Sequence, residues 1–106
     1  MKAVSATLPW VRGFAREMEA KLDANRHKGD PNGWRREQVS FLRRRLLEEV
    51  AELFHEMDTK GVPGIPDERK ARKARIRSEC ADVANFAMMI ADVAGGLAPA
   101  EKEPTE

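Results

Sequence analysis

Five acidic residues in two short segments have the spacing of a site for a divalent cation. The segment Glu48 to Glu52 contains three of them, and the segment Glu79 to Asp82 contains two. A helix turns by about 100° per residue, so acids three residues apart lie on one helix face. Gathered carboxylates repel and raise one another's pKa unless cations neutralise them, and hard divalent cations prefer oxygen ligands. The pattern predicts a metal site.

The two segments meet if their helices form an antiparallel hairpin. One register of that hairpin places Glu49 beside Asp82 and Glu52 beside Glu79, so that four acids converge. The ordinary alternative is a set of ion pairs between residues four apart on a helix, namely Arg44 with Glu48, Arg45 with Glu49 and Arg75 with Glu79. The metal interpretation is favoured because Glu49 and Glu79 lie at the margins of apolar faces and because a single register unites the set.

Three helices are predicted to position these acids, separated by two segments rich in glycine and proline. The helices are expected over about Leu8–Asn25, Glu37–Thr59 and Asp67–Ala94, where apolar residues recur every three or four positions. The segment 26–36 is expected to be a loop, and Gly61–Pro66 is long enough to reverse the chain. The fold class is therefore all-α.

Composition predicts one domain in a reducing compartment. The 106 residues suffice for one core, and residues 1–96 are expected to form a single all-α domain. The net charge of +1 gives no signal for a nucleic-acid polymer or a membrane. The single cysteine, Cys80, cannot form an intramolecular disulfide, and no apolar run is long enough for a signal peptide or a membrane span, so the cytoplasm is the expected location.

The segment Val83–Ala91 is apolar on nearly every side, which predicts contact with another subunit. We expect a homodimer or homotetramer whose helices are completed into bundles by oligomerisation. The tail, residues 97–106, has too few apolar residues to pack and is expected to be disordered.

The compound motif Glu48-Glu49-x-x-Glu52, followed after 26 residues by Glu79-x-x-Asp82, resembles that of the MazG-like nucleoside triphosphate pyrophosphohydrolases. The resemblance spans about residues 41–90. It implies an all-α oligomer that holds Mg²⁺, for which Mn²⁺ could substitute, between the two motif helices. It also implies cleavage of a nucleoside triphosphate between its α and β phosphates, giving a monophosphate and pyrophosphate, with a house-cleaning role on the nucleotide pool.

Carried over residue by residue, the resemblance implies roles for all five acids. Glu49, Glu52, Glu79 and Asp82 match the metal ligands, and Glu48 is a fifth acid that binds metal or orients water. Glu48, Glu49 and Glu52 are thus the expected catalytic residues.

Candidates for substrate contacts come from local chemistry. Trp34 can stack on a nucleobase or fasten the start of the second helix to the core. His27 and Lys28 can meet phosphate or base, or simply suit a helix C-terminus. Asn85, one turn after Asp82 in an apolar run, needs a hydrogen-bond partner that a sugar hydroxyl or a metal-bound water could provide.

Two other functions compete with hydrolysis. Glu52-Leu53-Phe54-His55 is a Glu-x-x-His sequence of the kind that binds iron in carboxylate-bridged helical bundles, although the chain has only one. The second competing function is that of a non-enzymatic helical module, which binds another protein through its apolar surface.

Overall fold

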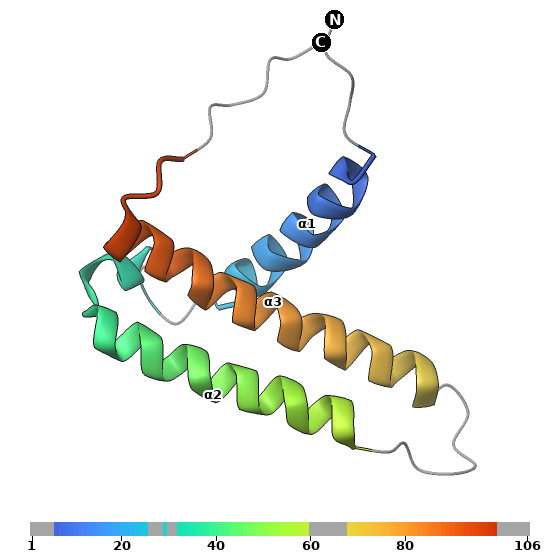
Figure 1. Cartoon of the computed structure of the whole chain (residues 1–106). Helices are drawn as coiled ribbons and strands as arrows, with labels where there is room; N and C mark the ends of the chain where they lie inside the picture. Colours follow the sequence, from blue (N-terminus) through green and yellow to red (C-terminus); the bar gives the residue numbers. More distant parts are fainter. Residues whose placement is uncertain (1–5, 26–28, 30–31, 60–67, 100–106) are drawn as a thin grey trace, which may run out of the picture.

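The protein is all-α, as the sequence predicts. The computed structural model describes residues 6–25, 29, 32–59 and 68–99, and Figure 1 shows the arrangement of their helices. The elements are α1 (Leu8–Ala24), the short 3₁₀ helix η2 (Gly33–Arg36), α2 (Val39–Asp58) and α3 (Glu68–Gly95). The three long helices lie within two residues of their predicted bounds. The predicted loop before α2 contains η2, and the predicted chain reversal at 61–66 lies outside the described residues.

Local chemistry explains where the helices begin and end. The carbonyl of Thr7 accepts hydrogen bonds from the backbone amides of Trp10 and Val11, each at 3.1 Å, and proline stands in the first turn of α1. At the end of α3, Gly96 has a positive φ of 65°, which glycine adopts without steric cost. The amide of Leu97 then donates to the carbonyl of Ala91 at 3.1 Å, closing the helix.

Helices α2 and α3 lie side by side along most of their length (Figure 1). Arg75, early in α3, forms an ion pair with Glu56, late in α2. Arg45, in the first half of α2, places its guanidinium 5.1 Å from the ring centre of Phe86, in the second half of α3. These contacts place the acidic segments of the two helices at the same level.

Helix α1 crosses α3 and contacts it through its second half, whereas its first turns point away from the other helices (Figure 1). Glu17 pairs with Arg77 at 3.0 Å, and Lys21 pairs with Asp82 at 3.2 Å. The α1 contacts therefore fall on the stretch of α3 that carries the candidate acids.

The interior of the described structure is small and half polar. Leu42 and Ala81 are its buried hydrophobic residues, while Glu49 and Asn85 are its buried polar ones. Large hydrophobic side chains are exposed instead on α1 and α2, at Trp10, Val11, Phe14, Val39, Phe41, Leu47, Phe54 and Met57. In the segment Val83–Ala91, which was expected to carry the subunit contact, the large side chains are partly buried. None of the described helices combines the length and apolarity needed to cross a membrane.

Candidate metal centre

Three of the predicted acids converge between α2 and α3. Glu49, Glu79 and Asp82 each offer a carboxylate oxygen, and these oxygens lie within 4.8 Å of one another. Glu49 comes from the middle of α2, and the other two come from consecutive turns of α3. The convergence follows from the three-residue spacing of the acids and from the pairing of the two helices.

The other two predicted acids lie at the edge of this group. Glu52 is exposed, but it is close enough to act on the pKa of both Glu49 and Glu79. The carboxylate of Glu48 is half exposed and forms an ion pair with Arg45. Among the residues described, the group that could share an ion contains no histidine, and His55 is exposed.

Two cations neutralise the cluster only in part. Arg45 donates from Nη2 to Oε1 of Glu49 at 2.9 Å, and Nζ of Lys21 lies 3.2 Å from Oδ2 of Asp82. Oε2 of Glu49 and Oε2 of Glu79 are nevertheless buried without a hydrogen-bond partner. An unsatisfied buried polar group typically costs about 1–3 kcal/mol, and more when it is charged. The cluster is thus costly as an arrangement of the protein alone.

Burial is the main reason that the pKa of Glu49 rises from 4.5 to about 7. The neighbouring carboxylates of Glu52 and Asp82 raise it further, while Arg45 opposes the shift. Burial likewise raises the pKa of Glu79, assisted by Asp82 and Glu52 and opposed by Lys21. In the absence of a cation the cluster therefore tends to hold a proton.

A cavity of about 270 Å³ adjoins the cluster and shares Asp82 with it. Its wall is mostly apolar, with a few polar groups, and includes Lys21, Trp34, Phe41, Asn85 and Phe86. Small-molecule sites usually combine an apolar wall with a few polar groups that fix orientation. Two of the predicted substrate contacts, Trp34 and Asn85, therefore line a cavity next to the acids. The other two, His27 and Lys28, lie outside the described residues.

The side-chain amide of Asn85 is buried, and one of its two polar atoms has a hydrogen-bond partner. It is 3% exposed, and its Nδ2 donates to the backbone carbonyl of Met18 at 3.1 Å. Its Oδ1 is buried without a partner. The amide thus ties α1 to α3 and retains an acceptor that a donor group in the cavity could satisfy.

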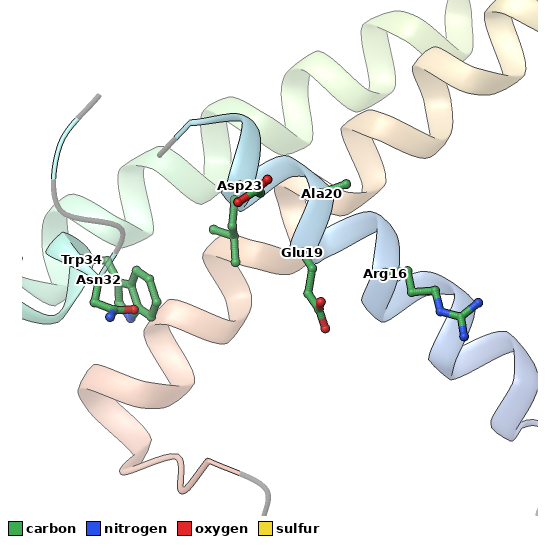
Figure 2. A pocket seen from close by; sticks show the side chains of 7 residues that line it. Arg16, Glu19, Ala20, Asp23, Asn32 and Trp34 are labelled. Atoms are coloured by element: carbon green, nitrogen blue, oxygen red, sulfur yellow. The ribbon is translucent and has the colours of Figure 1, made fainter. Parts of the chain in front are cut away.

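Trp34 lies on η2, where its Nε1 donates to Oδ2 of Asp92 at 3.3 Å. Its side chain also borders a second cavity, of about 510 Å³, which runs along α1 and whose wall includes the charged side chains of Arg16, Glu19 and Asp23. Figure 2 shows these α1 side chains on one side of the opening and Trp34 with Asn32 on the other. This larger cavity contains none of the five acids, so the smaller one is the better candidate for a ligand site.

Sequence reasoning missed Lys21 and Asp92. Lys21 lies on the face of α1 that contacts α3, next to the apolar Leu22. This neighbour was the only sign in the sequence that Lys21 would reach the site. Asp92 falls ten residues after Asp82 and close to the end of α3, with no motif around it. Of the expected four-residue ion pairs, that of Arg45 with Glu49 is confirmed, whereas Arg75 pairs with Glu56 and Glu68.

Comparison of the chain with protein families, with curated proteins and with solved structures gives no match.

Proposed function

We propose that this protein is a Mg²⁺-dependent nucleoside triphosphate pyrophosphohydrolase, in which α2 and α3 form an antiparallel hairpin around the metal. The observation that carries the proposal is the pair of buried, unpartnered oxygens on Glu49 and Glu79, two of the three acids whose carboxylate oxygens lie within 4.8 Å of one another. A structural ion-pair network would be expected to satisfy those oxygens with donors. A divalent cation would satisfy both of them and offset the repulsion.

The residues fit Mg²⁺ in chemistry and approximately in spacing. Mg²⁺ takes oxygen ligands at about 2.1 Å, which puts neighbouring ligand atoms about 3–4 Å apart. The carboxylate oxygens lie within 4.8 Å of one another, so small side-chain rotations would bring them into range. Mg²⁺ usually retains water and binds substrate phosphates beside one or two carboxylates, which suits a triphosphate substrate.

Side chains around the metal site are proposed to act together with the metal. Bound Mg²⁺ would polarise the phosphate and lower the pKa of water. Arg45 holds Glu49 in place through its Oε1 and leaves Oε2 for the metal. Exposed Glu52 is placed to accept a proton from water at the edge of the cluster, and Lys21 can release Asp82 to the metal and turn to a phosphate.

The cavity beside Asp82 is the proposed nucleoside site. Trp34 and Phe41 offer aromatic surface for a base, and the free Oδ1 of Asn85 can accept from a hydroxyl or amino group. Cleavage between the α and β phosphates would then occur at the acids. The biological role that this chemistry supports is removal of unwanted nucleotides from the pool.

We also propose that the protein functions as a homodimer or homotetramer. Few hydrophobic residues of the described structure are buried, and several large ones are exposed to solvent. Trp10 is 81% exposed, Leu47 63% and Phe54 56%. Leu47, Phe54 and Met57 share one side of α2, and Trp10, Val11 and Phe14 share the start of α1. A second copy supplies an apolar surface of the same kind, and obligate homodimers bury such surfaces. We therefore place the subunit contact on α1 and α2.

A screen for pyrophosphate release tests the hydrolase. The common and damaged ribo- and deoxynucleoside triphosphates should be incubated with the protein, with millimolar Mg²⁺ or with chelator. We expect Mg²⁺-dependent release from at least one substrate, its loss in Glu79→Gln and its retention in Glu56→Gln, which changes an acid of the Arg75 ion pair. If no substrate is cleaved and Mg²⁺ leaves the melting temperature unchanged, the protein is better explained as an interaction module.

A further inference from the structure

Asp92 fixes the indole of Trp34 at the edge of the smaller cavity. Its Oδ2 accepts a hydrogen bond from Nε1 of Trp34 at 3.3 Å and lies 3.2 Å from Nε of Arg35. The Asp92 side chain is only 16% exposed, whereas that of Arg35 is 67% exposed. One carboxylate oxygen on α3 therefore holds two consecutive residues of η2.

The element that carries Trp34 is short. It is four residues long, contains no buried residue, and follows residues 30–31, which lie outside the described ranges. A single 3₁₀ turn has weak hydrogen bonds of its own, so its position depends on tertiary contacts. Its contacts with the long helices are mainly with α3. Loss of the Asp92 acceptor would remove the hydrogen bond that orients the ring.

The position of the ring matters because Trp34 borders both cavities. The hydrogen bond from Nε1 uses the edge of the indole and leaves its faces available for stacking. A free indole would have to give up rotational freedom on binding a base, and this loss opposes binding. Holding the ring in advance removes that cost.

We propose that Asp92 is a positioning residue for nucleoside recognition, acting through Trp34. This inference rests on the proposed function, since it takes the nucleobase as the group that meets the indole. It assigns Asp92 no contact with the substrate and no part in phosphate chemistry. Its loss should therefore raise KM and leave kcat nearly unchanged.

A double-mutant cycle separates positioning from general stability. Asp92→Ala and Trp34→Phe each remove one end of the hydrogen bond, and we expect each to raise KM about tenfold, equivalent to about 1.4 kcal/mol. The double variant should be no worse than Trp34→Phe alone, because the two residues act as one unit. Asp92→Asn, which keeps an acceptor, should recover most of the affinity, and Asp58→Ala, at the exposed end of α2, should resemble the parent.

Fluorescence reports the position of the ring without any hydrolysis. The chain has two tryptophans, so Trp10→Phe leaves Trp34 as the sole emitter. In that background we expect Asp92→Ala to shift emission to longer wavelength and to increase quenching by acrylamide, while Asp58→Ala, which removes an exposed acid at the end of α2, changes neither. The common nucleoside monophosphates should quench Trp34 in the parent background, and Asp92→Ala should weaken their binding.

Two results would overturn the inference. One is an unchanged Trp34 spectrum in a folded Asp92→Ala variant, and the other is an equal rise in KM when Asp92→Ala is made in the Trp34→Phe background. Failure of the proposed function looks different, because the parent would then release no pyrophosphate from any triphosphate. In that case the monophosphate titration tests nucleotide binding independently of hydrolysis. Absence of any nucleotide effect on Trp34 fluorescence would reject the role of Asp92 as well.

Discussion

Glu49 gives one carboxylate oxygen to Arg45 and keeps the other, Oε2, buried and without a hydrogen-bond partner. A carboxylate in this position can be satisfied by a proton or by a cation. The raised pKa of Glu49 is the protein's response when only protons are available. Proton and Mg²⁺ should therefore compete for the same oxygens.

The first prediction concerns stability against pH in the metal-free protein. The folded form holds the Glu49 proton between pH 4.5, the ordinary pKa of the group, and about 7, whereas the unfolded chain has released it. The free energy of unfolding should consequently fall as pH rises through this range, by at most about 3 kcal/mol, and remain lower above it. In chelator, urea denaturation of the parent and of Glu49→Gln at several pH values should show a larger fall in the parent, because only Glu79 keeps a raised pKa in the variant. If the free energy of unfolding fell equally with pH in the two proteins, this result would contradict a raised pKa of Glu49.

The second prediction concerns Mg²⁺ and the folded state. A cation that binds only the folded protein stabilises it by mass action, by about 2.7 kcal/mol at a hundred times its Kd. The parent should therefore melt at a higher temperature in millimolar Mg²⁺ than in chelator, and Glu79→Gln should gain much less. Glu56→Gln, with the same change of side chain at the Arg75 ion pair, should respond as the parent does. If Mg²⁺ raised the melting temperature of all three proteins equally, this result would argue against the acidic cluster as the binding site.

The third prediction tests the part played by Glu52. The carboxylate of Glu52 raises the pKa of Glu49, so Glu52→Gln, which removes this negative charge, should lower that pKa. Carbon-13 NMR of the glutamate carboxyl groups measures the change directly. The same variant should melt no lower than the parent without metal and should lose hydrolysis by at least about 100-fold. A lower melting temperature without metal would instead indicate that Glu52 belongs to a stabilising ion-pair network.

The fourth prediction concerns self-association. If α2 contributes to a subunit contact, Phe54→Glu introduces a charge into an apolar interface and should shift the protein toward the monomer. Ala71→Glu, on the exposed and charged part of α3, should leave the assembly unchanged. Sedimentation velocity at micromolar concentration distinguishes these outcomes. A parent that sediments as a stable monomer would refute the oligomer itself.

The long helices and the meeting of Glu49, Glu79 and Asp82 could be predicted because both depend on spacing along a helix. Contacts that depend on how separate elements cross could not. The pairing of Lys21 with Asp82 requires the path of α1 over α3, and the contact of Asp92 with Trp34 requires the position of η2. Likewise, Arg75 was expected to pair along its own helix with Glu79, but the neighbouring helix brings Glu56 within its reach.

The attachment of α1 has a consequence for how this protein can evolve. Asp82 binds Lys21, and Asn85 binds the carbonyl of Met18, so the turns of α3 that serve the candidate site also anchor a helix. A lineage with no further need of the proposed activity could replace Glu79 and keep its architecture, but replacing Asp82 would loosen α1 as well. In a saturation library selected only for cellular abundance, position 82 should thus tolerate fewer substitutions than position 79. Descendants that had lost the proposed activity would then still carry an acid at position 82.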